Sequence, residues 1–509
     1  MPPYLCAVER WATRIGALLA LIGGAVGLGN FLRFPFQAAK WGGGAFLVPY
    51  MVALVLVALP LVWMEMAIGR AVQHTASLPH ALQTLAPRTG HTVGLLSLYV
   101  SLGIASYYAY LTGWTLGYSV HALAGTFRER SLAETVAFHA HFVQRESWVF
   151  YLLVWVILGW VLRKGLQKGL ETLSLYGTPL LFLLAVGIAV GTLFVGETGR
   201  CETCSVGAGL AYLYKPRWQE LAQPAVWLAA TAQVFFSVGV GFGMYPVYAA
   251  HAHRLNAYRE GFLTVLANTL AEVGLGGLIV IPLTTAFLGL ETMRARASFG
   301  LGFEVMPYVL QAWGGRLLVL AWYALLFLAA FTSLIAMAWV GLMWLAEQFG
   351  GPPRRWAWPL VGALAFLGLP AVAGVSVGTL DLYDYWMSNL FLLLSAAGFW
   401  YVFRLRPLWA LLEEESHFRM PGWLKRVLIG TPAVFLGALL IGSFFQPASA
   451  DWIGAFRSLL YTGRWPFSPD ALPVWLGDKL LASPLNLLGF LMLVGYGVTL
   501  LLLSRRART

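Results

Sequence analysis

Charged residues and cysteines are both scarce in this sequence. Only 11% of the 509 residues are charged, whereas soluble domains average about 25%. Three cysteines are too few for a disulfide scaffold or a cysteine metal framework. With 59% hydrophobic residues and a mean hydropathy of +0.72, the chain is expected to be an all-α polytopic membrane protein embedded in the lipid bilayer.

The net positive charge of the chain is explained by its predicted membrane topology. The net charge is +11, but the excess of lysine and arginine lies in segments on one side of the predicted spans. This distribution obeys the positive-inside rule and predicts a multi-pass protein of the plasma (inner) membrane with both termini cytoplasmic. We therefore expect no nucleic-acid partner. Because the first apolar run is long and continues into the fold, we also expect no cleavable signal peptide.

Twelve apolar segments are predicted to cross the bilayer. Between the seventh and eighth, the segment 296–315 is only moderately apolar and ends in Gly314-Gly315, so we expect a hairpin lid outside the membrane. The predicted spans cover residues 12–35, 43–70, 92–124, 147–163, 168–196, 226–250, 259–289, 316–347, 356–374, 383–404, 427–446 and 484–504.

Glycines interrupt the first and the sixth predicted spans. In the first span, four glycines point to several sides of the helix: Gly23, Gly24, Gly27 and Gly29. In the sixth span, glycines recur at every second position up to Gly243. A packing seam needs small residues on one face only, so we favour interrupted helices over a seam.

Interrupted helices at membrane depth expose backbone groups that lipid cannot satisfy, so such breaks line a cavity or hold a ligand. Two broken spans in corresponding places are typical of a transport site. Because each half holds five spans, the second half enters the bilayer from the opposite side, so any repeat must be inverted. We expect one transporter domain of residues 1–509, in which 12–250 hold the first repeat and the start of the second, 226–404 the second repeat, and 427–504 two peripheral spans.

Charged side chains inside spans are costly and mark functional positions. Glu65 is expected to bond the broken backbone of a neighbouring helix. Glu272 follows Asn268 by one helical turn, so both face the same way, and its carboxyl group could be ionised or protonated according to the occupancy of a nearby cation site. Arg33 and Asp384, at the outer ends of their spans, are candidates for an outer gate.

Cys201 and Cys204 form a Cys-x-x-Cys in a predicted outer loop. An oxidised pair is one interpretation, because that compartment permits disulfides. We favour the other, two unpaired thiols without a function.

Several motifs together resemble the neurotransmitter:sodium symporter family. They are Trp11 to Pro35, with Gly27-Leu28-Gly29-Asn30-Phe31-Leu32-Arg33 inside it, Gly42 to Phe46, Tyr107-Tyr108, Gln233 to Ser237, Phe331-Thr332-Ser333 and Asp381 to Asp384. The resemblance covers nearly the whole chain and is greatest for the bacterial amino-acid branch. It implies a LeuT-type fold of twelve transmembrane helices, a 5+5 inverted repeat and broken helices one and six.

The resemblance implies one or two sodium ions held by hard oxygen ligands, and no organic cofactor. The first site would use the Ala25 carbonyl, Asn30, Ser237, Asn268 and the carboxylate of the substrate. The second would use the carbonyls of Gly23, Val26 and Ala329 with the hydroxyls of Thr332 and Ser333.

The resemblance also implies an amino-acid site between the two breaks. The carboxylate of the substrate would meet Tyr108 and the amides of Leu28 and Gly29, where a half-helix begins. Phe236 would help to close the outer side. The implied substrate residues are Ala25, Gly27, Leu28, Gly29, Ile104, Tyr108, Phe236, Ser237, Gly239, Phe242, Ser333 and Met337.

Three positions restrict the class of substrate and the ion requirement that the resemblance implies. Monoamine carriers of this family have an aspartate in the place of Gly27, so here the substrate must bring its own carboxylate. Gly239 stands in place of a serine and leaves room for a larger apolar or aromatic side chain. Chloride-dependent members have a neutral residue in the place of Glu272, so its carboxylate implies chloride independence, and its protonation would ease the return of the empty carrier.

The chain departs from the family at the inner gate. The expected arginine is replaced by Val8, its acidic partner appears as Glu347, and a tyrosine of the sixth span appears as His251. Arg10 or Arg14 could supply the missing cation, and His251 could make inner closure pH-sensitive. The alternative is a weaker gate with a solvated histidine.

Together these features predict a sodium-coupled symporter that imports a hydrophobic or aromatic L-amino acid by alternating access. The alternative is an amino-acid sensor with a transporter-like fold that does not translocate its ligand. An enzyme is not expected. The expected partners are the amino acid and the bilayer, and a homodimer remains an alternative to a monomer.

Overall fold

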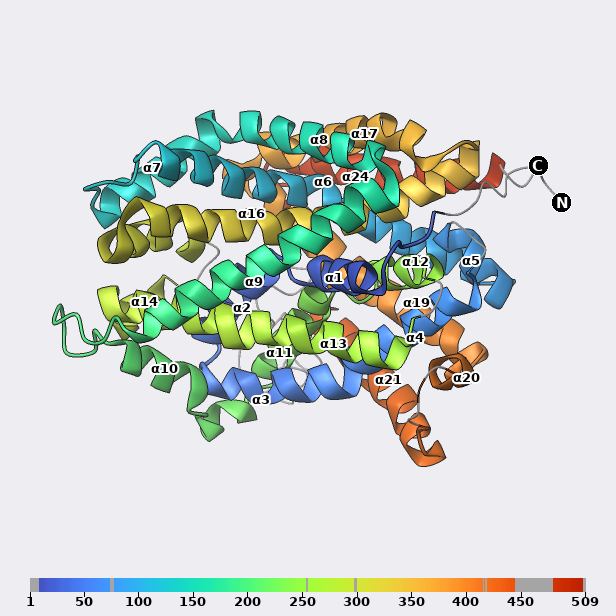
Figure 1. Cartoon of the computed structure of the whole chain (residues 1–509), viewed down its shortest axis with the longest axis horizontal. Coiled ribbons are helices and arrows are strands. Elements are labelled where there is room, and N and C mark those ends of the chain that lie inside the picture. The colour runs from blue at the N-terminus through green and yellow to red at the C-terminus, as the bar shows by residue number, and fades with distance from the viewer. Residues whose placement is uncertain are drawn as a thin grey trace, which may run out of the picture.

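The computed structural model of the chain describes residues 9–73, 77–252, 255–296, 300–414, 416, 419–444 and 479–506. In these residues the fold is helical, and the only strand-like pairing in them is an isolated bridge between Glu197 and Ser205. The long helices run side by side along the longest axis of the molecule (Figure 1).

The first half of the chain contains the first broken helix and four further spans. Its elements are α1 (Arg14–Ala25), η1 (Gly29–Arg33), α2 (Phe34–Lys40), α3 (Gly44–Ala53), η2 (Leu54–Ala58), α4 (Leu59–Ala71), α5 (Leu78–Leu85), α6 (Gly90–Leu123), α7 (Leu132–Arg145), α8 (Ser147–Arg163), η3 (Leu166–Glu171) and α9 (Thr172–Leu193).

The second half contains the second broken helix, the lid region and the remaining spans. Its elements are α10 (Val206–Tyr214), η4 (Trp218–Ala222), α11 (Pro224–Val238), α12 (Met244–Ala250), α13 (Ala257–Thr269), η5 (Leu270–Gly276), α14 (Gly277–Leu288), α15 (Leu290–Ala295), η6 (Leu301–Val305), α16 (Met306–Phe349), η7 (Pro353–Trp356), α17 (Ala357–Ala373), η8 (Val375–Val377), α18 (Thr379–Asp384), η9 (Tyr385–Phe391), α19 (Leu392–Leu405), α20 (Trp409–Glu413), α21 (Gly422–Phe444) and α24 (Pro484–Arg506).

Nine helices of the described residues are long and apolar enough to cross a membrane, and eleven are counted if each of two bent pairs is one span. The pairs are Arg14–Ala25 with Gly29–Lys40, bent by 45°, and Leu132–Arg145 with Ser147–Arg163, bent by 61°. The sixth predicted span falls on α11 and α12. Each of the twelve predicted segments therefore falls mainly on helices. Residues 445 and 446 of the eleventh lie outside the described residues.

Both predicted interruptions are present. The first helix ends at Ala25, takes an extended conformation at Val26 (φ −78°, ψ 104°), and resumes at Gly29. The sixth span breaks between α11 and α12, where Gly239, Gly241 and Gly243 have φ of 77°, 88° and 76°. Residues with a side chain rarely adopt that left-handed backbone conformation. The alternating glycines therefore allow the second break.

The segment predicted as a lid, 296–315, is helical over most of its described residues. It holds η6 and the start of α16, and the backbone leaves the helical region at Gly315 (φ 68°, ψ −167°). Its place outside the membrane stays a prediction.

The interpretation of two unpaired cysteines is wrong. A disulfide joins Cys201 to Cys204 in the loop between α9 and α10. A turn in which the Cys204 amide donates to the Cys201 carbonyl at 3.1 Å brings the two residues together. This local folding of the loop was not predictable from the spacing alone.

The last two described spans pack on opposite parts of the helix assembly. Helix α21 contacts α19 and α4, whereas α24 contacts α17 and α18. Only 22% of the most apolar window of each helix is buried within the protein, so most of their surface is available to lipid.

Candidate functional site

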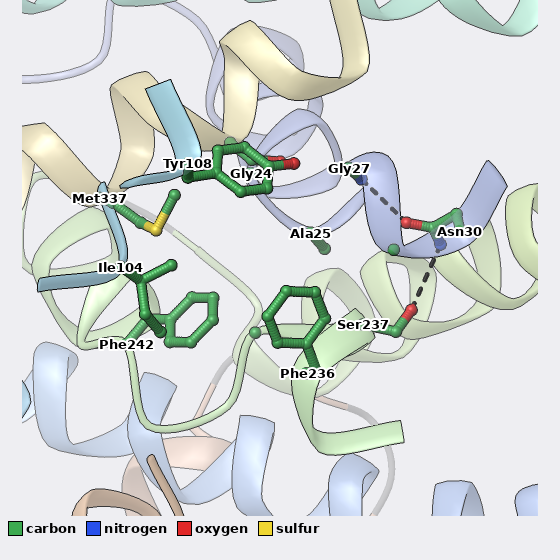
Figure 2. Close-up of a pocket in the computed structure, with 13 residues that line it drawn as sticks. Gly24, Ala25, Gly27, Asn30, Ile104, Tyr108, Phe236, Ser237, Phe242 and Met337 are labelled. Carbon is green, nitrogen blue, oxygen red and sulfur yellow. Dashed lines mark hydrogen bonds between the residues drawn. The ribbon is translucent and has the colours of Figure 1, made fainter. Parts of the chain in front are cut away.

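A small cavity of about 20 Å³ lies between the two helix breaks (Figure 2). Its walls come from α1, α6, the break after α11, and α16. The lining residues are Gly24, Ala25, Gly27, Gly29, Asn30, Ile104, Tyr108, Phe236, Ser237, Gly239, Phe242, Ser333 and Met337. Eleven of the twelve predicted substrate residues are therefore brought together here; Leu28 instead lines a second, larger cavity described below. Gly24 is an addition that the sequence motifs did not indicate.

One group of oxygen atoms gathers at the side of this cavity where Asn268 lies. In one orientation of its amide, Asn268 turns its oxygen toward the carbonyl oxygens of Ala25 and Ser237, at 3.1 and 3.2 Å; in the other, its nitrogen donates to both. Converging acceptors are stable only with a cation or a proton donor between them. We call Ala25, Asn30, Ser237 and Asn268 the first oxygen cluster.

Asn30 takes part in this cluster through both ends of its amide. Its Oδ1 accepts a hydrogen bond from the Gly27 amide at 2.8 Å, and its Nδ2 donates to Asn268 Oδ1 at 2.8 Å (Figure 2 draws the first of these). Asn30 would have to rotate its amide to offer an oxygen to a cation. The four predicted ligands are in contact, and the residue set fits a hard cation.

A second group of oxygens lies where α1 meets α16. Ser333 Oγ is 3.4 Å from the carbonyl oxygens of both Gly23 and Val26. It is also 3.2 Å from the carbonyl of Ala329, as is Thr332 Oγ1. Neighbouring oxygens that bind one hard cation at about 2.4 Å lie about 3.4 Å apart. These distances join Ser333 to three of the other predicted ligands and Thr332 to one, and they suit a hard cation. We call the five predicted ligands of the second site the second oxygen cluster.

The polar end of the cavity is closed by Tyr108. The Leu28 amide donates to Tyr108 Oη at 2.9 Å, in the turn between α1 and η1. A Cβ atom on Gly27 would lie only 2.8 Å from both Tyr108 Oη and Ser333 Oγ. No larger residue fits at Gly27 unless these hydroxyls move.

The opposite end of the cavity is apolar. Phe236 and Phe242 meet edge to face with ring centroids 6.4 Å apart, and Ile104 and Met337 lie beside them (Figure 2). At Gly239 a side chain would be strained by the φ of 77°, and a Cβ would also lie 2.9 Å from Met244, a contact that the sequence did not reveal.

Three comparisons with known proteins bear on this geometry. The model of the Sodium:neurotransmitter symporter family matches residues 8–129 and 138–452. The chain belongs to this family. It is a family of sodium-dependent transporters and not of enzymes, so sodium is a co-transported ion of this multi-pass membrane protein.

Individual relatives agree with the assignment. An uncharacterized sodium-dependent transporter of Haemophilus influenzae is 25% identical over 413 residues, which cover 77% of this chain and 87% of the relative. The sodium-dependent neutral amino acid transporter SLC6A17 of Homo sapiens is 28% identical over 306 residues, 52% of this chain and 40% of the relative. The crystal structure of MhsT in complex with L-phenylalanine superposes with a TM-score of 0.75 at 26% identity, over 85% of this chain and 98% of MhsT. The predicted LeuT-type fold is confirmed.

Glu272 of this symporter is fully buried beside the first oxygen cluster. It accepts hydrogen bonds from Tyr50 Oη at 2.6 Å, from Gln233 Nε2 at 2.5 Å and from Ser237 Oγ at 2.5 Å. Sequence reasoning did not single out Tyr50 or Gln233 as partners of this group. Three donors around one carboxylate form an anion site in which the anion is part of the protein.

Glu65 makes the contact predicted for it. Its Oε1 accepts a hydrogen bond from the Gly241 amide at 2.7 Å, within the break after α11. The carboxylate thus satisfies a backbone group that the break exposes at membrane depth.

A larger cavity of about 370 Å³ lies on the side of Phe236 and Tyr108 that is predicted to face outward. Arg33 and Asp384 both line it but do not form the expected ion pair in this structure. Arg33 lies over the Phe236 ring, 4.4 Å from its centroid, while Asp384 Oδ1 accepts from Tyr107 Oη at 2.8 Å. Their gating role remains a prediction.

The inner end differs from the sequence-based expectation. Val8 lies outside the described residues. Arg14 pairs with Glu260 at 2.6 Å and does not take the place of the missing arginine beside Glu347. Glu347 instead accepts from the Ser77 amide at 2.6 Å and lies 3.3 Å from His80 Nδ1.

The interpretation of His251 as a solvated side chain is wrong. It is 1% exposed, and its Nδ1 contacts the Val247 carbonyl at 2.9 Å. Its Nε2 is buried without a hydrogen-bond partner. The proposed influence of pH on inner closure through His251 stays a prediction.

Proposed function

We propose that this symporter imports a hydrophobic or aromatic L-amino acid together with sodium, by alternating access and without chloride. The observation that carries the proposal is the pair of oxygen clusters flanking one cavity at the two helix breaks. A cation and the carboxylate of a substrate neutralise each other in such a site, which is costly to charge with either alone. Each net positive charge moved inward gains about 2.3 kcal/mol per 100 mV of inside-negative potential.

The polar end of the cavity favours an α-amino acid over an amine. Tyr108 and the Leu28 amide form a polar pair at the start of a half-helix, where an anion is stabilised. The close approach around Gly27 leaves no space for a protein carboxylate at that position. The carboxylate that completes the first oxygen cluster would therefore come from the substrate.

The apolar end favours a large uncharged side chain. Phe236, Phe242, Ile104 and Met337 surround it, and the cavity of about 20 Å³ has room for roughly one water molecule. The two phenylalanine rings would turn aside as a substrate side chain enters between them. MhsT was solved with L-phenylalanine and SLC6A17 is named as a neutral amino acid transporter, which supports the same substrate class.

Glu272 supports chloride independence. Its carboxylate already accepts from Tyr50, Gln233 and Ser237, so the three donors need no added anion. Protonation of this group when sodium has left would lower the cost of returning the empty carrier.

Uptake of labelled L-phenylalanine into proteoliposomes tests the proposal. We expect accumulation only with an inward sodium gradient, competition by apolar and aromatic amino acids in a panel of twenty, and no change when gluconate replaces chloride. Binding without accumulation would favour the sensor. Accumulation without sodium, or competition by amines alone, would contradict the proposal.

We further propose that both termini lie in the cytoplasm. The end of α24 and the first residues of α1 lie at the same end of the molecule (Figure 1), and this agrees with an even number of spans. A reporter fused to the C-terminus, active only in the cytoplasm, is expected to be active.

A further inference from the structure

The segment that leads into α1 and the start of the fifth span are joined by reciprocal hydrogen bonds, in which a carboxylate of each segment accepts from backbone amides of the other. Glu171, the last residue of η3, accepts hydrogen bonds from the amides of Ala12 and Thr13 at 2.8 and 2.9 Å, and from Thr13 Oγ1 at 2.8 Å. In return, Glu9 accepts from the amide of Leu166, the first residue of η3, at 2.6 Å. We call these five residues the reciprocal clasp.

The reciprocal clasp is held by a buried carboxylate and is not a loose surface contact. Glu171 is only 2% exposed, and its negative charge lies at the N-terminus of α1, where the helix dipole stabilises it. A Cβ atom on Gly16 would lie 2.2 Å from Glu171 Oε1. The glycine on α1 thus provides the space that the carboxylate occupies.

Two further contacts hold the same short stretch of chain. Arg14 pairs with the fully buried Glu260 of α13 at 2.6 Å. The indole nitrogen of Trp11 donates to the Tyr248 carbonyl of α12 at 3.0 Å. In Figure 1, α1 lies among α9, α12 and α13, the elements to which these contacts lead. Residues 9–14 are therefore the place where the inner end of α1 is fastened.

The opposite end of α1 is the second oxygen cluster, where Gly23 and Val26 face Ser333. Along its length α1 also contacts α9, for example where Thr178 Oγ1 donates to the Leu19 carbonyl at 3.1 Å. A cation bound in the cluster would hold one end of α1, while the clasp holds the other. For such an ion to leave toward the cytoplasm, the inner end of α1 would have to move away from α9.

We propose that the reciprocal clasp closes the inner gate of this symporter, with Glu171 as the positioning residue that keeps α1 against α9. It would do the work of the ion pair that the chain lacks because Val8 replaces an arginine. The inference rests on the proposed function, since it assumes that α1 moves to release sodium. Weakening the clasp would increase the inward-open population, and the apparent sodium affinity would fall in proportion to the closed fraction.

A buried cysteine can report the separation of α1 from α9. Thr178 is fully buried, and Thr178→Cys in a Cys6→Ser background would react with a thiol reagent only when α1 has moved away, because Cys201 and Cys204 are joined. In the purified parent, sodium is expected to slow labelling. In Glu171→Gln we expect labelling without sodium to be about tenfold faster, the effect of one lost charge-assisted hydrogen bond, and protection to need about tenfold more sodium.

A second variant and a matched control separate the clasp from general destabilisation. Gly16→Ala keeps the carboxylate but displaces it, and alanine itself favours a helix, so faster labelling in this variant points to the clasp. Glu134→Gln makes the same chemical change in the cap of an outer helix, where Glu134 Oε2 accepts from the Ser131 amide at 2.7 Å. Its labelling is expected to match the parent.

The outcomes distinguish a failure of the reciprocal clasp from a failure of the proposed function. If sodium slows labelling in the parent but Glu171→Gln and Gly16→Ala behave like the parent, the clasp is refuted and the proposed function stands. A lower melting temperature of Glu171→Gln with unchanged sodium protection would also refute it, because Glu171 would then be only structural. If sodium has no effect on the parent, the proposed function fails and the gating role of the clasp fails with it.

Discussion

Replacing Glu272 by serine removes a buried negative charge next to the first oxygen cluster. Ser237 joins the two features, since its Oγ donates to Glu272 at 2.5 Å and its carbonyl belongs to the cluster. The substitution also leaves Tyr50 and Gln233 as donors without their acceptor. A cation in the cluster therefore loses a favourable charge, and the vacated space is lined by groups that attract an anion.

The expected effect is large enough to measure. At an effective dielectric constant of about 20 and a separation of about 6 Å, the attraction between Glu272 and a sodium ion is about 3 kcal/mol. This corresponds to about a hundredfold in affinity. We expect the sodium affinity of Glu272→Ser to fall by about that factor in gluconate medium and to recover for the most part in chloride.

The assay is equilibrium binding of labelled L-phenylalanine to purified protein during a sodium titration, with chloride or gluconate as the anion. Glu65→Gln is the control, because Glu65 is equally buried but bonds the Gly241 amide; it is expected to gain no chloride requirement. The reasoning is refuted if the parent protein needs chloride. It is also refuted if Glu272→Ser keeps the parent affinity in gluconate.

Three further substitutions test other parts of the structure. Ser333→Ala removes the hydroxyl that faces three carbonyls, so at least about tenfold more sodium should be needed for half-maximal substrate binding; an unchanged titration would argue against the second oxygen cluster. Gly27→Asp places atoms 2.8 Å from Tyr108 and Ser333 and a second negative charge beside the carboxylate of the substrate. Calorimetry should detect no L-phenylalanine binding, and retained binding would contradict the assignment of the polar end. The double substitution Cys201→Ser and Cys204→Ser should cost about 2 kcal/mol of stability, seen as a lower melting temperature. A reducing agent should lower the melting temperature of the parent to the same extent and leave the variant unchanged.

The binding cavity was predictable to an unusual degree because its residues lie at points where the backbone itself must break. Gly239 and Gly243 occupy conformations that other residues rarely adopt, so their spacing along the chain is enough to locate the break. The motif around Gly27 then places Leu28 and Asn30 next to the opening. The predicted place of the Leu28 amide beside Tyr108 is found, at 2.9 Å. That Leu28 also lines the larger cavity was not predictable, because the side on which a residue of an unwound segment lies depends on the local dihedral angles.

The charged groups were less predictable because their partners are distant in the sequence. The sequence suggests Arg14 as a substitute in the inner gate, but it pairs with Glu260, which is 246 positions away. The partners of Glu347 are His80 and Ser77, which the sequence does not indicate. Arg33 and Asp384 line one cavity without touching. No spacing rule specifies which of several charges near span ends will meet.

By itself, the sequence determined where most of the apolar spans lie, the two breaks and the residue types at the oxygen clusters, because apolar length and glycine conformation are local properties. The tertiary structure alone decided the contacts that hold the inner end of α1. Glu171 reaches Thr13 across 158 positions, and Gly16 must lie beside it before the carboxylate fits. Such a contact depends on how two helices pack, and packing is a property of the assembled chain.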